Sequence, residues 1–122
     1  MAIYNELDNY ILSLNEDVKK NTTSVYVSYA HNINFIEIWF RTNSLRYVIM
    51  AGEYDDPRGA VSKLAESYRW SKERYISVNN DSDLEYVKNI LKQSFEKQVN
   101  RSNNKKNFIK HGVFLFYYKS IY

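Results

Sequence analysis

The sequence has no cysteine, one proline and three glycines among 122 residues. Without cysteine, disulfides, thiolate nucleophiles and thiolate metal ligands are excluded. The scarcity of glycine and proline predicts regular elements joined by short turns rather than a loop-rich scaffold. Because 44% of the residues are hydrophobic and 25% are charged, the composition is that of a folded globular chain and not of a disordered one.

Sequence signals for export, membrane insertion and catalysis are also missing. The N-terminus has neither a basic region nor an apolar core, and the longest apolar runs fall far short of the ~20 residues that cross a bilayer. Glycine-rich nucleotide loops and a nucleophile elbow are absent. The two histidines, His31 and His111, are far apart and have no patterned acids nearby. We therefore expect a cytoplasmic protein that is not an enzyme and has no membrane contact, cofactor or metal site.

The net charge of +3 is unevenly distributed along the chain. Residues 1–98 contain 12 Lys and Arg against 14 Asp and Glu, a net charge of −2, whereas residues 99–122 contain five basic residues and no acid. This shift predicts a single α+β domain over 1–98 and a basic, aromatic tail over 99–122. A body of this charge cannot attract nucleic acid by its overall field, so a nucleic-acid site there would need a local patch.

Apolar spacing predicts the elements of the first half. Ile3, Leu7 and Ile11 recur at helical spacing, which predicts an amphipathic helix to Leu14. A polar linker is expected over Glu16–Ser24. Short turns then separate three β-rich runs, which predict an antiparallel meander: Val25–Ala30, Phe35–Phe40 and Leu45–Met50. In the second run Ile36, Ile38 and Phe40 share the face that is expected to meet the helices. The other face is aromatic and is expected to be partly exposed to solvent.

The second half predicts a loop, one strand and a long helix. Turn residues over Gly52–Gly59 indicate a central loop, which we expect a short helix over Ala60–Tyr68 to follow. Alternation over Arg74–Val78 predicts a fourth strand. The run Ser82-Asp83-Leu84-Glu85 resembles a capping box with Ser82 as the cap, and the helix that it opens is expected to end near Gln98 and to pack on one sheet face. In the tail, Gly112–Tyr118 has the composition of an added edge strand.

Several segments, in the same order, resemble the bacterial domain-of-unknown-function family 5655. They span residues 7–98 and include Leu14–Val18, Asn34–Ile38, Asp55–Gly59, Arg74–Val78 and Asp83–Val87. That family occurs alone or at the C-terminal end of larger bacterial proteins, some of them nuclease-like or restriction-type and some labelled predicted transport proteins. The resemblance implies an accessory module whose catalysis is supplied by another domain, and it carries over no catalytic residue. The tail does not share the pattern.

Arginine and aromatic residues are the remaining candidates for a contact surface. Such groups suit phosphates and stacked bases, and they also anchor protein interfaces or simply fill structural roles. We predict a non-catalytic recognition module for nucleic acid or a nuclease-type partner protein, either monomeric or weakly dimeric. The alternatives are a purely structural, self-associating domain and an enzyme with an unrecognised site. The candidate contact residues are Arg41, Arg46, Tyr54, Arg58, Tyr68, Arg69, Trp70 and Arg74.

Overall fold

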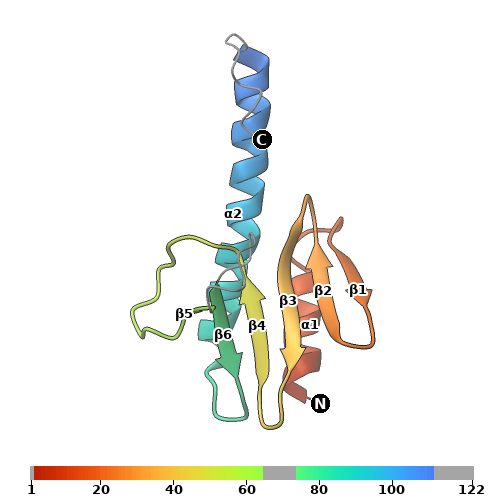
Figure 1. Ribbon diagram of the computed structural model, residues 1–122, viewed down its shortest axis with the longest axis vertical. Coiled ribbons are helices and arrows are strands. Elements are labelled where there is room, and N and C mark those ends of the chain that lie inside the picture. The colour runs from red at the N-terminus through yellow and green to blue at the C-terminus, as the bar shows by residue number, and fades with distance from the viewer. Residues whose placement is uncertain (1, 65–73, 112–122) are drawn as a thin grey trace.

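The computed structural model describes residues 2–64 and 74–111, with side chains described as far as residue 100. Two helices cover the same face of an antiparallel sheet (Figure 1), as the sequence predicted. The strand order is β1-β2-β3-β4-β6-β5. The elements are α1 (Ala2–Leu12), β1 (Lys19–Thr22), β2 (Tyr26–Ala30), β3 (Asn34–Phe40), β4 (Leu45–Ile49), β5 (Ser62–Lys63), β6 (Arg74–Val78) and α2 (Leu84–His111).

The predicted meander is confirmed, and its register explains the core. Val27, Ile38, Tyr47 and Ile76 are paired across β2, β3, β4 and β6, and none is more than 4% exposed. Because side chains alternate along a strand, this row and its neighbours two residues away lie on the helix side. The predicted trio Ile36, Ile38 and Phe40 shares that side, but Phe40 lies at the end of β3, half exposed, with its ring 6.1 Å from that of Tyr4 in α1.

The two edge strands correct the sequence interpretation. Lys19–Thr22, predicted as linker, is β1, and it pairs antiparallel with β2 although all four of its residues are exposed. Ser62–Lys63, predicted as helix, is β5 and pairs with β6. The Asp56 carboxylate accepts hydrogen bonds from the amides of Ala60 and Val61, which holds the chain before β5 against the loop. The rest of that predicted helix, residues 65–68, lies outside the described residues.

The start of α2 is capped one residue later than predicted. The Asp83 carboxylate accepts hydrogen bonds from the amides of Glu85 and Tyr86, so Asp83 and not Ser82 is the cap. The Ser82 hydroxyl instead accepts from the Asn79 amide and closes the turn after β6. Ser82 therefore closes the preceding turn, and the Asp83 carboxylate is left to accept from the helix amides.

The end of α2 near Gln98 was also predicted wrongly. The helix continues through residue 98 to His111 and projects beyond the sheet (Figure 1). Lysine favours a helix, asparagine and serine weaken it only slightly, and the first residue after 98 that breaks a helix strongly is Gly112. The strand predicted over residues 112–118 lies outside the described residues.

Polar side chains on one stretch of α2 hold two loops by their backbones. Gln93 both accepts from the Asp55 amide and donates to its carbonyl. Ser94 accepts from the Met50 amide at 3.0 Å and donates to the Phe35 carbonyl at 2.6 Å. These contacts fix the loop after β4 and the start of β3 against the helix. Two further side chains act in the same way, since Lys97 donates to the Glu53 carbonyl and Gln98 accepts from the Asn32 amide.

Candidate functional site

The predicted contact residues lie in separate places in the structure. Arg41 lies in the turn between β3 and β4, and Arg46 lies on the sheet face away from the helices. Tyr54 and Arg58 lie in the central loop against α2, and Arg74 begins β6 opposite Ile49. Their roles in binding stay predictions. Tyr68, Arg69 and Trp70 lie outside the described residues.

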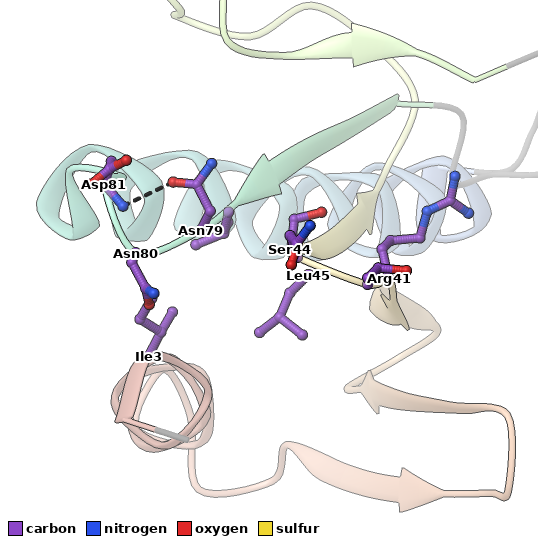
Figure 2. A pocket seen from close by; sticks show the side chains of 10 residues that line it. Ile3, Arg41, Ser44, Leu45, Asn79, Asn80 and Asp81 are labelled. Carbon is purple, nitrogen blue, oxygen red and sulfur yellow. Dashed lines mark hydrogen bonds between the residues drawn. The ribbon is translucent and has the colours of Figure 1, made fainter.

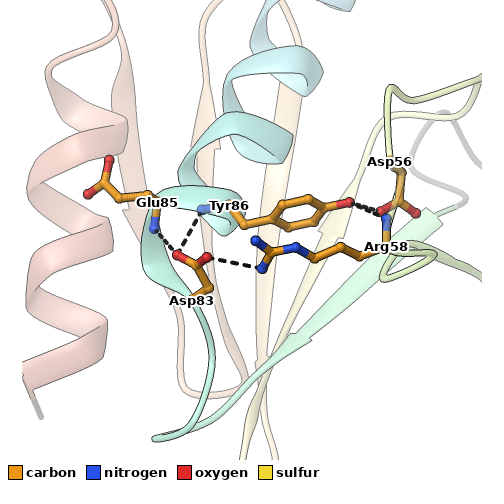
Figure 3. A network of polar contacts seen from close by, with 5 residues as sticks. All are labelled: Asp56, Arg58, Asp83, Glu85 and Tyr86. Atoms are coloured by element: carbon orange, nitrogen blue, oxygen red, sulfur yellow. Dashed lines mark hydrogen bonds and ion pairs between the residues drawn. The ribbon is translucent and has the colours of Figure 1, made fainter.

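A polar network joins the central loop to the start of α2 (Figure 3). The Arg58 guanidinium lies 4.5 Å from the Tyr86 ring centre and forms an ion pair with Asp83 at 3.0 Å. The Tyr86 hydroxyl donates to the Asp56 carboxylate and accepts from the Arg58 amide. Arg58 is therefore engaged within the molecule, and its main effect in this arrangement is to hold the loop.

The carboxylates of this network have pKa values below their ordinary range. At Asp56, desolvation by itself would raise the pKa, but hydrogen bonds from Tyr86, Val61 and Ala60 outweigh it and lower the pKa. At Asp83, the hydrogen bond from Arg58 is the largest cause of the lowered pKa, followed by the backbone amide of Tyr86. The folded structure therefore stabilises the ionised form of both side chains relative to the protonated form.

The lowered pKa of Asp56 predicts a loss of stability in acid. A carboxylate whose pKa is lower when folded stabilises the fold above its unfolded pKa, near 3.8, and this contribution disappears as the pH falls through the folded value. We expect the free energy of unfolding to decrease below about pH 4, and Asp56→Asn to flatten that decrease, as measured by urea unfolding over a pH series.

The matched control for this experiment is Asp17→Asn. Asp17 is exposed, and its carboxylate forms no hydrogen bond or ion pair with the part of the chain that the structure describes. Its replacement should leave the pH profile of the wild type unchanged. Equal flattening by both variants would show that the acid response comes from overall charge and not from the loop network.

The sheet face away from the helices carries a row of aromatic and arginine side chains. Tyr26, Trp39 and Arg46 are paired across β2, β3 and β4, and all three are half-buried. The Trp39 indole donates to the Glu37 carboxylate at 2.7 Å, and the Arg46 guanidinium lies 4.1 Å from the Tyr75 ring centre. We call these five residues the outer-face cluster. Ser28 and Val48 on the same face are buried, so part of the face is shielded from solvent.

A pocket of about 550 Å³ lies at the end of the sheet where α1 begins (Figure 2). Its apolar residues are Ile3, Leu45 and Val78. The remaining lining comes from two turns, the one between β3 and β4 and the one between β6 and α2. Sequence reasoning proposed Arg41 as a contact residue but none of the other residues of these two turns. Their polar residues are Arg41, Thr42, Asn43, Ser44, Asn79, Asn80 and Asp81.

Among residues 2–64 and 74–100, no three metal-ligating side chains gather in a group that could hold an ion. Neither described helix combines the length and the apolar character needed to span a bilayer.

Comparison with known proteins gives a distant bacterial relative. A protein of Haemophilus influenzae, itself described as uncharacterized, is 26% identical over 97 residues. The match covers 77% of this chain but only 32% of the relative, so the chain spans about a third of that protein's length. No protein-family model and no solved structure matches the chain. The resemblance to the family of unknown function therefore stays a prediction, and so does the cytoplasmic location.

Proposed function

We propose that this chain is a non-catalytic recognition module that binds a partner protein through the outer-face cluster. The observation that carries the proposal is the row of Tyr26, Trp39 and Arg46, half-buried side chains from three neighbouring strands. Tyrosine, tryptophan and arginine are the residues most enriched at the energetic centres of protein interfaces. Because the strands fix the spacing of these three side chains, binding should cost little conformational entropy.

Charge favours a protein over a nucleic acid as the partner of this face. Within the outer-face cluster, one carboxylate, Glu37, accompanies one guanidinium, Arg46. Residues 1–98 as a whole have a net charge of −2. Since binding to phosphates depends on concentrated positive charge, a neutral aromatic face suits a protein surface better.

The distant relative supports the role of a module. The matched region is about a third of a longer protein, which is what is expected of a unit that combines with other parts. The roles of the polar side chains within the fold also support a non-catalytic module. Gln93, Ser94 and Arg58 form contacts that hold the fold, and no catalytic constellation accompanies them in the described part of the chain.

Photo-crosslinking tests the proposed surface. A photoreactive phenylalanine derivative at Tyr26 should yield discrete crosslinked products in cells of the source organism, because this position lies in the binding face. The same group at Leu12, exposed at the end of α1, is the matched control and should not yield them. With the partner identified and purified, Trp39→Ala should weaken binding about tenfold or more, as measured by calorimetry. Equal crosslinking at both positions, or full affinity of Trp39→Ala, would contradict the proposal.

Nucleic acid is a second candidate, favoured by the far end of α2. Residues 99–111 continue as helix, and their sequence contains four Lys and Arg residues and no acid. If this stretch binds single-stranded DNA or RNA, affinity should fall steeply with salt and should decrease when Lys105 and Lys106 are replaced by Gln. Trp39→Ala should not affect it. Loss of oligonucleotide binding in Trp39→Ala would instead assign the outer-face cluster to nucleic acid and overturn the proposal of a protein partner.

A further inference from the structure

The pocket at the end of the sheet has the size and the base of a small-molecule site. Its volume of about 550 Å³ falls within the range of about 300–1,000 Å³ that is typical of ligand pockets. Leu45 and Val78 are paired across β4 and β6, and Ile3 belongs to α1. Paired strands and a helix thus provide a rigid apolar base for a ligand.

One wall is a turn whose shape is maintained without its outermost side chains. The Asn79 carbonyl accepts from the Ser82 amide, the Asn79 amide donates to the Ser82 hydroxyl, and the Asn79 side chain accepts from the Asp81 amide. The side chains of Asn80 and Asp81 form no hydrogen bond or ion pair with the described residues, and both are exposed. Both are therefore available to a ligand without a cost to the turn.

The opposite wall has the same property. The turn from Arg41 to Ser44 is closed by a backbone hydrogen bond of 2.9 Å from the Arg41 amide to the Ser44 carbonyl. The side chains of Arg41, Thr42 and Asn43 are exposed and bond to no described residue. Arg41 thus differs from Arg58, which forms an ion pair with Asp83, although both were predicted as contact residues.

The charges of the pocket are separated along it. Figure 2 shows Asp81 and Arg41 at opposite ends, with Ile3, Asn80 and Leu45 between them. The Arg41 side chain extends away from Leu45 and Ile3, so a ligand group that meets its guanidinium lies beyond the apolar base. A complementary ligand has a cation at one end, an anion at the other and an apolar group between. Side-chain amides such as Asn80 can both donate to and accept from a peptide group in the middle.

We propose that this pocket binds a small zwitterionic ligand of the amino-acid or short-peptide class. The ammonium group meets Asp81, the carboxylate meets Arg41, and an apolar side chain covers Ile3, Leu45 and Val78. The site is distinct from the outer-face cluster, so this inference does not depend on the proposed function.

Titration of the full chain, followed by NMR, tests the site. The probes are leucine, dileucine and trileucine, which differ in the separation of their end charges. We expect saturable shifts at the amides of Leu45, Val78 and Asn80, with the tightest binding for the probe whose length matches the separation of the two charges. Arg41→Gln and Asp81→Asn should each weaken that binding roughly fivefold, since exposed charge pairs contribute up to about 1 kcal/mol. Lys92→Gln, which removes an exposed charge on α2 outside the pocket and the outer-face cluster, is the control and should leave the affinity unchanged.

Capped probes identify which residue recognises which end. Acetylation of the ligand's amino group should weaken binding to the wild type but not further weaken binding to Asp81→Asn. Amidation of the carboxylate should behave in the same way with Arg41→Gln. The absence of saturable binding at millimolar probe concentrations would overturn the inference, as would equal losses on capping in the wild type and the matching variant. Either result would leave the crosslinking test of the outer face unaffected.

Discussion

Replacing Leu91 with alanine is expected to lower the free energy of unfolding by about 2–5 kcal/mol. Leu91 is fully buried in the core between α2 and the sheet, beside Ile90, so truncation removes apolar contact and leaves a cavity. Small domains are stable by only about 5–15 kcal/mol, and the variant should therefore lose a large fraction of its stability. Urea unfolding followed by circular dichroism measures the change.

The neighbouring Lys92→Ala is the matched control for this prediction. Lys92 lies on the same helix, is exposed, and forms no hydrogen bond or ion pair with the described residues. Alanine favours a helix at least as well as lysine, so the change should remain within about 0.5 kcal/mol of the wild type. Similar losses in the two variants would mean that α2 contributes through its helicity and not through its packing against the sheet.

Replacing Ser94 with alanine should also be strongly destabilising although it removes a single oxygen. The hydroxyl is fully buried and bonds both the Met50 amide and the Phe35 carbonyl. Alanine leaves both backbone groups buried without a partner, at about 1–3 kcal/mol each, so we expect a total loss of about 2–6 kcal/mol. Urea unfolding measures the loss, and hydrogen exchange of the Met50 amide should become faster.

Ser77→Ala provides the comparison for Ser94→Ala. Ser77 lies on β6, is exposed, and its hydroxyl bonds to no described residue. Its replacement should change stability by less than about 0.5 kcal/mol. If Ser94→Ala were as mild, or if exchange of the Met50 amide stayed slow, the two loops would be held by the apolar core alone.

The elements that sequence predicted are those whose apolar residues face the core. Burial imposes a period on the sequence, so β3 alternates and α1 repeats Leu7 and Ile11 one turn apart, both fully buried. The two strands that the sequence analysis did not predict, β1 and β5, bury no side chain, since all their residues are exposed. They pair through backbone groups, which every residue has, so their pairing leaves no pattern in the sequence. The composition change after Gln98 indicated a boundary because it altered charge, but it brought no residue that ends a helix.

The candidate site was predicted less well, because residue type does not determine which face a side chain joins. Arg46 and Trp39 become neighbours only through the register of β3 and β4. The ion partner of Arg58 is Asp83, 25 residues further along the chain, and no local pattern identifies it. The pocket residues Asn80 and Asp81 were not among the predicted contact residues, because their residue types favour turns as much as polar contacts with a ligand.

The edges of the sheet determine how other molecules can approach this protein. β1 contains two lysines and is solvent-exposed along its whole length, and β5 is only two residues long. An incoming strand would have to desolvate ammonium groups at one edge and, within the part of the chain that the structure describes, would find only the short β5 at the other. Extension of the sheet from one copy to the next is therefore disfavoured, and the protein can display aromatic side chains on its surface with little tendency to polymerise through its strands.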